Sequence, residues 1–379
     1  MIYNNLIINK EKFDNLIKFK NNKIPNAFIF HGNDGSGKEA HAIEFFGLLN
    51  CKGNNKFACG SCTSCNKTKK LQHEDLKMIF PLPKNKSINK HDSPLKALNN
   101  ESLKSMDEMI AYKGKNPYFK IKIKNANTIL INSIREVKKN INLSIENDKY
   151  KIYMIFEAEK LCYPNSESAN SLLKVLEEPP ENVLFILITS DISLLLDTLV
   201  SRCVPIYFPK LKDSRIEDYL NKHNSNNSYN HEIAKISNGN ILNAMMLSEN
   251  YKERMDDLES IINIIIDKNY KNIDKINHFF KNKNESIETL DLLNLFLRSI
   301  FLGNQNFQYL HKTKKYMLTN YKNVKWGKCI LLINNTQNYM LKNGNIEILI
   351  ISLIIEIKKI LNNEFHNINI IEEYLNYSN

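Results

Sequence analysis

Residues 170–208 have the sequence NSLLKVLEEPPENVLFILITSDISLLLDTLVSRCVPIYF, which combines a helical pattern, two prolines and an unbroken apolar run. Ala169, Leu172 and Leu176 recur at helical spacing, which predicts an amphipathic helix that ends at the two following prolines. The six apolar residues at 183–188 are too few for a buried helix and include β-branched side chains, so they predict a strand that is apolar on both faces. Such a strand belongs inside a parallel sheet covered by helices, and the sequence therefore predicts an α/β domain.

Polar residues follow this strand. Residues 189–191 are Thr-Ser-Asp, at the carboxyl end of a strand, where ligands of open α/β sheets bind. A short helix is predicted at 194–199, followed by Arg202 in the turn Ser-Arg-Cys and a last strand at 204–208. An arginine held between a helix and a strand is placed to reach out of its own domain.

A second predicted strand, at residues 27–30, leads through HGNDGSGK at 31–38 into an apolar helix. This order of strand, glycine loop and helix is what a phosphate loop requires, because backbone N–H groups and one lysine surround the phosphates. The position after the lysine normally carries serine or threonine to bind magnesium, but here it is Glu39. We therefore predict a degenerate phosphate loop. Its residues are Gly32, Gly35, Gly37 and Lys38.

Four cysteines have the spacing C-x7-C-x2-C-x2-C. They are Cys51, Cys59, Cys62 and Cys65. Thiolates two residues apart can converge on one tetrahedral ion, and sulfur ligands favour zinc over calcium or magnesium. An iron–sulfur cluster takes the same ligands, and four buried thiols without a metal are the other alternative. Gly53 and Gly60 are typical of a loop rather than of a core, so we expect a structural zinc site.

The composition of the chain limits its size class, its partners and its compartment. The chain has 379 residues, enough for two or three domains, and a formal net charge of +11. This charge suggests a nucleic-acid partner, but lysine and asparagine are spread throughout the chain, so a compositional background explains it equally well. The N-terminus lacks a signal-peptide pattern, and no apolar stretch approaches the ~20 residues needed to span a bilayer. The cysteines are mostly clustered, which argues against a secreted disulfide framework. We therefore expect a cytoplasmic protein without membrane contact.

The chain divides by pattern. Residues 1–208 form the predicted α/β domain, which includes the cysteine module at 51–65 and another buried strand at 152–156. Residues 81–120 are polar and rich in lysine, asparagine and serine, and we expect a long, partly mobile insertion. Short helical patterns follow, and then longer helical patterns without a repeat.

The segments LLKVLEEPPENVLFILITSD and LVSRC resemble the sensor-1 strand and the Ser-Arg-Cys motif of bacterial clamp-loader subunits of DNA polymerase III, which are AAA+ proteins. The resemblance covers about the first two-thirds of the chain. It implies an α/β RecA-like AAA+ domain at 1–208 with a zinc-binding insertion, a small helical lid at 209–250 and an all-α C-terminal collar domain at 251–379. It also implies partners: the gamma/tau and delta subunits in a hetero-oligomeric ring, the sliding clamp, and primer–template DNA through the complex.

Within this family, the chain is more similar to the non-motor delta-prime subunit than to the gamma/tau motor. Motors carry Asp-Glu where this chain has Phe156 and Glu157, and an arginine where it has Leu242. Together with Glu39, these differences imply weak or absent ATP binding and no catalysis by this chain alone, although it would belong to a DNA polymerase holoenzyme. Arg202 stands where the family places an arginine finger for the neighbouring subunit's ATP.

Three alternatives stay open. The chain is an ATP-hydrolysing gamma/tau-type subunit, against which Glu39, Phe156 and Leu242 argue. It is an unrelated zinc module with a remnant phosphate loop, against which the Ser-Arg-Cys context argues. Arg202 itself has a plainer interpretation, as a surface arginine or a structural ion pair.

Overall fold

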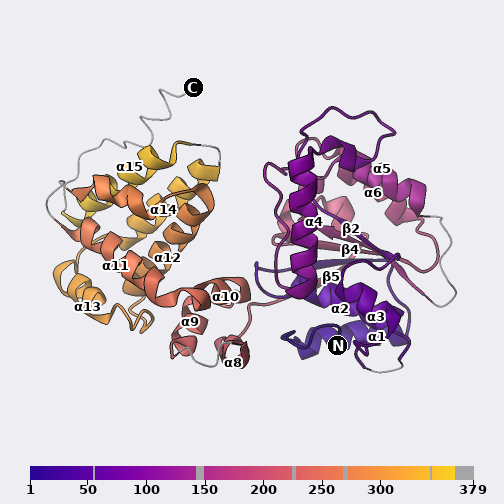
Figure 1. The fold of residues 1–379 in the computed structure, drawn as a ribbon, viewed down its shortest axis with the longest axis horizontal. Helices are drawn as coiled ribbons and strands as arrows, with labels where there is room; N and C mark the ends of the chain where they lie inside the picture. The colour runs from indigo at the N-terminus through magenta and orange to yellow at the C-terminus, as the bar shows by residue number, and fades with distance from the viewer. Residues whose placement is uncertain (54–55, 142–148, 224–227, 268–271, 342–343, 363–379) are drawn as a thin grey trace. The chain divides into compact units, whose positions relative to one another are not determined.

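The structure is a computed structural model, and it describes residues 1–53, 56–141, 149–223, 228–267, 272–341 and 344–362 (Figure 1). Two compact units divide the chain. Unit 1 comprises Met1–Lys222 with Asn238–Asn243, and unit 2 comprises His223–Ser237 with Ala244–Asn379.

Unit 1 is built on a parallel five-stranded sheet with the strand order β2-β3-β4-β1-β5. All seven residues of β4 are buried, and β4 pairs with β3 on one side and with β1 on the other. The prediction of a central strand that is apolar on both faces is therefore confirmed. The strands are β1 (Ala27–His31), β2 (Leu76–Ile79), β3 (Lys151–Phe156), β4 (Val183–Thr189) and β5 (Val204–Tyr207).

Helices cover the sheet on both faces (Figure 1). Val137 of α5 (Ile131–Asn140) and Leu172 of α6 (Glu167–Glu177) share one buried cluster with Phe185 of β4. On the other face, Phe45 of α2 (Lys38–Asn50) packs edge to face with Phe28, with ring centroids 6.0 Å apart. The remaining helical elements before residue 224 are α1 (Lys10–Asn21), α3 (Thr63–Lys69), η1 (Pro94–Ala97), α4 (Asn100–Lys115), η2 (Ala158–Leu161), η3 (Ile192–Leu194), α7 (Asp197–Val200) and α8 (Asp213–His223).

Two parts of unit 1 differ from the sequence predictions. The edge strand β2 was not predicted, because its four residues, LKMI, are too few for a periodic pattern. The insertion at 81–120, expected to be long and partly mobile, instead contains the 16-residue helix α4. The side chain of Asn99 caps α4 by accepting from the amide of Ser102. The helix buries only Met106, Lys113 and Gly114. Its sequence is therefore largely polar and lacks the apolar periodicity from which a helix is predicted.

The described residues of unit 2 form helices. On α15, the buried residues Leu349, Leu353 and Ile357 repeat at intervals of four, which gives the helix one apolar face. No helix among the described residues is both long and apolar enough to cross a membrane. The helical elements after residue 227 are α9 (Asn230–Ile236), α10 (Ile241–Glu249), α11 (Tyr251–Ile266), η5 (Asp274–Phe279), α12 (Lys283–Phe301), α13 (His311–Asn320), α14 (Trp326–Leu341) and α15 (Ile346–Leu361).

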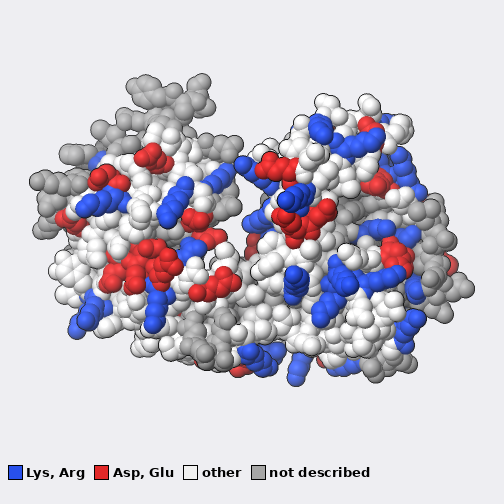
Figure 2. Space-filling view, in the orientation of Figure 1, with Lys and Arg blue, Asp and Glu red and all other residues white. Residues whose placement is uncertain are grey.

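Charge of both signs is distributed over each unit. On the face drawn in Figure 2, both signs of charge are present on each unit, aspartate and glutamate side chains gather in one larger cluster on unit 2, and the described residues of that face show no continuous basic stripe. The net charge of +11 therefore does not by itself locate a nucleic-acid site on this face.

Candidate phosphate loop, arginine and metal sites

The predicted phosphate loop lies between β1 and α2, at the carboxyl end of the sheet. Gly35 and Gly37 have left-handed backbone conformations, with φ of +72° and +84°, which only glycine adopts without strain. Lys38 begins α2, and its side chain is 6% exposed. Its Nζ donates to the carbonyl oxygen of Asn33 at 3.2 Å and lies 3.6 Å from the carboxylate of Asp34. The phosphate lysine is therefore bonded within its own loop.

Asp34 lies between two ammonium groups. The Nζ of Lys120 donates to both carboxylate oxygens of Asp34, at 3.1 and 3.2 Å. Burial works against ionisation of Asp34, but Lys120 and Lys38 outweigh it and hold the pKa of Asp34 below its ordinary value. The loop therefore carries its own anion next to the lysine that would otherwise meet a phosphate.

Glu39, at the magnesium position, forms an ion pair with Lys113 of α4. The side chain of Lys113 is fully buried, and its Nζ also donates to the carbonyl oxygen of Phe119 at 2.6 Å. The same ammonium lies 5.4 Å from the centre of the Phe156 ring, within the range of a cation–π interaction. Two departures from the motor pattern, Glu39 and Phe156, thus meet one ammonium group. Sequence reasoning missed Lys113 because it lies 74 residues from Glu39 in a polar segment.

The polar groups at the ends of β3 and β4 are also engaged within unit 1. The carboxylate of Glu157 pairs with Lys160 at 2.9 Å. The hydroxyl of Thr189 donates to the carboxylate of Glu159 at 2.6 Å. Glu157 is therefore not a free general base in this arrangement.

The segment that resembles sensor 2 lies against the phosphate loop. The amide of Ile241 donates to the carbonyl oxygen of Gly35 at 3.3 Å, and a Cβ at Gly35 would overlap the side chain of Asn240. Leu242, two residues after Asn240, is partly buried and supplies no charge there. The segment contacts the loop through backbone and amide groups and lacks the cation of a motor.

Arg202 lies in the turn between α7 and β5. Its Nη2 lies 2.9 Å from a carboxylate oxygen of Glu177, the last residue of α6, and its Nη1 donates to the carbonyl oxygen of Thr198 at 3.0 Å. The Arg202 side chain is 36% exposed. The guanidinium is thus accessible, but in this chain it is engaged in the ion pair that was the plainer interpretation. Exposed ion pairs of this kind contribute about 0–1 kcal/mol to stability.

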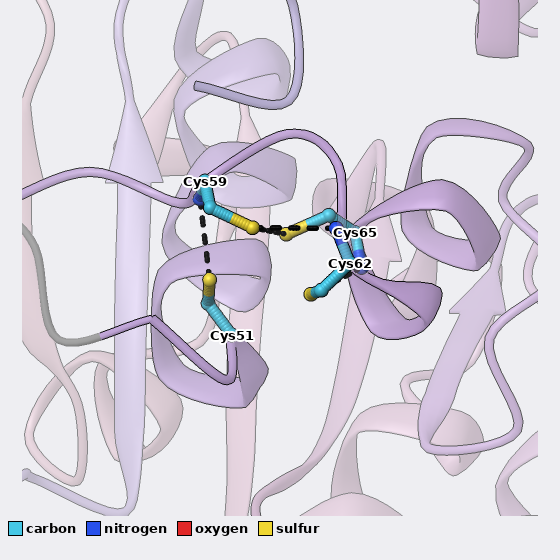
Figure 3. A group of neighbouring side chains, drawn as sticks. All are labelled: Cys51, Cys59, Cys62 and Cys65. Atoms are coloured by element: carbon cyan, nitrogen blue, oxygen red, sulfur yellow. Dashed lines mark hydrogen bonds between the residues drawn. The ribbon is translucent and has the colours of Figure 1, made fainter.

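The four predicted metal ligands come together (Figure 3). Cys51 follows α2, Cys59 lies in the loop, and Cys62 and Cys65 lie at the start of α3. Their Sγ atoms all lie within 4.8 Å of one another, and those of Cys59 and Cys65 are 3.7 Å apart. Around a tetrahedral zinc with Zn–S bonds of about 2.3 Å, neighbouring sulfurs are about 3.8 Å apart, so the arrangement fits that ion.

Backbone amides face three of these sulfurs. The N–H groups of Ser61 and Cys62 lower the pKa of the Cys59 thiol to about 5, which favours the thiolate that binds metals. Burial raises the pKa of the Cys65 thiol, so the spacing of the four sulfurs supports a sulfur-preferring cation more than their ionisation does. The amide contacts are Gly53 N and Cys59 N to Cys51 Sγ at 3.3 and 3.2 Å, Cys62 N to Cys59 Sγ at 3.3 Å, and Cys65 N to Cys62 Sγ at 3.4 Å.

The other three cysteines lie outside this cluster. Burial raises the pKa of the Cys203 and Cys329 thiols to about 12, and burial also raises the pKa of Cys162. Thiols that stay protonated at neutral pH are poor nucleophiles, so these three cysteines fit a packing role better than a catalytic one.

Comparison with known proteins identifies the family. Residues 8–212 match the family described as "DNA polymerase III, delta subunit". The chain belongs to this family. It is 26% identical over 293 residues to DNA polymerase III subunit delta' of Bacillus subtilis, covering 75% of each chain. It is also 27% identical over 202 residues to subunit tau/gamma of Haemophilus influenzae, covering 53% of this chain and 22% of that protein.

A solved structure provides a further likeness. A DNA polymerase III gamma-subunit-related protein of Thermotoga maritima aligns with a TM-score of 0.46 and 16% identity, over 92% of this chain and 99% of the other. The resemblance seen in residues 170–208 is thus confirmed at the level of the family, whose relatives include both delta' and tau/gamma subunits.

Proposed function

We propose that this chain is a non-motor, delta-prime-like subunit of a bacterial DNA polymerase III clamp loader, which helps to load the sliding clamp onto primed DNA. The observation that carries this proposal is the ion pair of Glu39 with Lys113, whose ammonium also lies near Phe156. Phosphoryl transfer needs a magnesium ion in this region to neutralise developing charge. In this chain Glu39 and Phe156 replace the hydroxyl and the carboxylate that would bind the ion, and the ammonium group of Lys113 lies next to both.

In this proposal, residues 1–208 are the AAA+ domain, residues 209–250 the lid and residues 251–379 the collar that assembles the ring. The parallel sheet with its covering helices supports the first assignment, and α11 to α15 support the last. The partners are gamma/tau and delta subunits, the sliding clamp, and primer–template DNA through the complex.

Arg202 is the residue that this subunit contributes to catalysis by its neighbour. A guanidinium stays charged at all physiological pH values and can contact two phosphate oxygens at once. The exposed pair with Glu177 orients it on the short turn before β5, and an incoming phosphate replaces the carboxylate.

The four thiolates hold a structural zinc ion that ties the end of α2 to the start of α3. A metal bound by residues from two elements contributes its binding free energy to folding, because the site does not exist in the unfolded chain.

The deciding experiment measures ATP turnover. We expect the isolated chain to show no magnesium-dependent turnover above that of Lys38→Ala. In the reconstituted ring, Arg202→Ala should assemble normally and slow turnover by the neighbouring subunit, by less than the roughly 10³–10⁵-fold known for single-site fingers because other subunits keep theirs. Turnover by the isolated chain that disappears in Lys38→Ala would support the gamma/tau-type alternative instead.

A further inference from the structure

One segment of the insertion, residues 113–120, contacts the phosphate loop at three successive places. At its start, Lys113 pairs with Glu39, the residue after the loop lysine. In its middle, the ring of Tyr118 lies 3.4 Å from where a Cβ on Gly37 would be. At its end, Lys120 donates to both carboxylate oxygens of Asp34. The segment therefore follows the loop along its length.

Tyr118 also joins two other elements to the loop. Its side chain is 5% exposed, and its hydroxyl accepts from the amide of Ile7 at 2.6 Å. Its ring packs edge to face with Tyr219 of α8, with centroids 5.9 Å apart and an interplanar angle of 90°. An aromatic ring is thus enclosed between the N-terminal segment, α8 and Gly37. The ring lies in van der Waals contact with the position of a Cβ on Gly37, so it packs directly against the loop.

The charges of the segment and loop correspond to those of a bound ligand. A working phosphate loop places its lysine against phosphate oxygens and its serine or threonine against magnesium. In this chain the lysine, Lys38, lies 3.6 Å from the Asp34 carboxylate, and the residue at the magnesium position, Glu39, meets the Lys113 ammonium. The Asp34 carboxylate thus lies where the phosphate anion of a nucleotide would meet the lysine, and the Lys113 ammonium lies where magnesium would bind.

We propose that residues 113–120 act together with Asp34 of the loop itself as an internal substitute for nucleotide and magnesium: Asp34 supplies the anion beside Lys38, Lys113 supplies the cation beside Glu39, and Tyr118 holds the loop, the N-terminal segment and α8 together. The inference rests on the proposed function and deepens it, because it explains why a non-motor subunit keeps an ordered phosphate loop. It also assigns a role to the insertion at 81–120.

The test uses the full chain and ADP with Mg²⁺ as the probe, measured by titration calorimetry. The variant Glu39→Thr/Lys113→Ala/Tyr118→Ala removes the contacts of Lys113 and Tyr118 with the loop, leaves those of Asp34 with Lys38 and Lys120, and restores a hydroxyl at the magnesium position. We expect no saturable binding to the wild type at ~1 mM ADP and at least about tenfold tighter binding to the variant. Lys104→Ala, an exposed lysine on the same helix but outside residues 113–120, is the matched control and should behave as wild type.

A second measurement applies if the triple variant does not fold. In a double-mutant cycle of Glu39→Gln and Lys113→Met, we compare the equilibrium constants of unfolding from urea titration. The change in the double variant should differ about tenfold from the product of the two single changes. Multiplicative constants would overturn the proposal. A folded triple variant that binds ADP no more tightly than the wild type would also overturn it. Each of these results leaves the Arg202→Ala ring assay unaffected, so the two proposals fail separately.

Discussion

The guanidinium of Arg202 and the carboxylate of Glu177 form an ion pair of 2.9 Å that links the Ser-Arg-Cys turn to the last residue of α6. The two side chains are 36% and 51% exposed, so water screens their attraction. The contact orients the guanidinium without fixing it. This weak attachment is compatible with the proposed role of Arg202, in which the guanidinium exchanges the carboxylate of Glu177 for a phosphate of the neighbouring subunit.

The Glu177→Gln variant tests this relationship. We expect the free energy of unfolding to change by less than about 0.5 kcal/mol, because an exposed pair contributes little. If Arg202 acts as the proposed finger, ATP turnover in the reconstituted ring should lie between those of the wild type and Arg202→Ala, since the guanidinium is present but less well oriented. The exposed neighbour Glu178→Gln is the control. A loss of more than about 2 kcal/mol in urea unfolding would make the pair structural instead.

Zinc content tests the cysteine site. Wild type purified without a histidine tag should carry one zinc per chain by atomic emission, and Cys62→Ser should lose most of it and become sensitive to proteolysis between α2 and α3. Structural zinc provides roughly 10–16 kcal/mol of binding free energy in small domains, so its loss must loosen the loop. Cys329→Ser, a buried thiol outside the cluster, should keep its zinc. A well-folded wild type with neither zinc nor iron would rule out the metal site.

The buried His41 should make the folded chain less stable at acid pH. It is fully buried beside the phosphate loop, where its Nδ1 donates to the carbonyl oxygen of Gly37 at 2.7 Å and its Nε2 accepts from the amide of Asn9 at 2.9 Å. Burial lowers the pKa of His41 from 6.5 to about 4. The unfolded chain therefore binds the proton first, and stability should fall by up to about 3 kcal/mol as the pH drops from 6.5 to 4.

The measurement for His41 is the free energy of unfolding in urea at several pH values. In His41→Gln the slope between pH 6.5 and 4 should flatten, although the variant is less stable at pH 7. His91→Gln, which alters an exposed histidine, should keep the wild-type slope. Equal slopes in all three proteins would refute the assignment.

Adding a single methyl group at Gly35 should lower the free energy of unfolding substantially. Gly35→Ala must adopt φ of +72° and overlap the side chain of Asn240, so we expect a loss of about 3 kcal/mol or more in the free energy of unfolding. Gly303 is the matched control, because its φ is +64° but no atom lies within 4 Å of the added Cβ. Gly303→Ala should cost about 1 kcal/mol from the backbone alone. Equal losses would show that Asn240 moves away freely.

The sequence alone determined the parallel α/β core and the grouping of the cysteines. Residues 183–188 are apolar without alternation, and the prolines at 179–180 end the helix before them, so both elements follow from local pattern. The sulfurs of Cys62 and Cys65 converge because Cys62 is the N-cap of α3 and Cys65 lies in the first turn of that helix, so three residues along the chain bring the two side chains close together. Local geometry sufficed in both cases.

Only the tertiary structure decided what the unusual residues contact. Glu39 and Lys113 are 74 residues apart, and Glu177 and Arg202 are 25 apart. Neither pair leaves a periodic signal, because an ion pair depends on where the chain brings two charges and not on the residues between them. The helix α4 was hidden for a related reason: it buries few side chains, so hydrophobic periodicity does not mark it, and its buried Lys113 gains a partner only when α4 lies beside the phosphate loop.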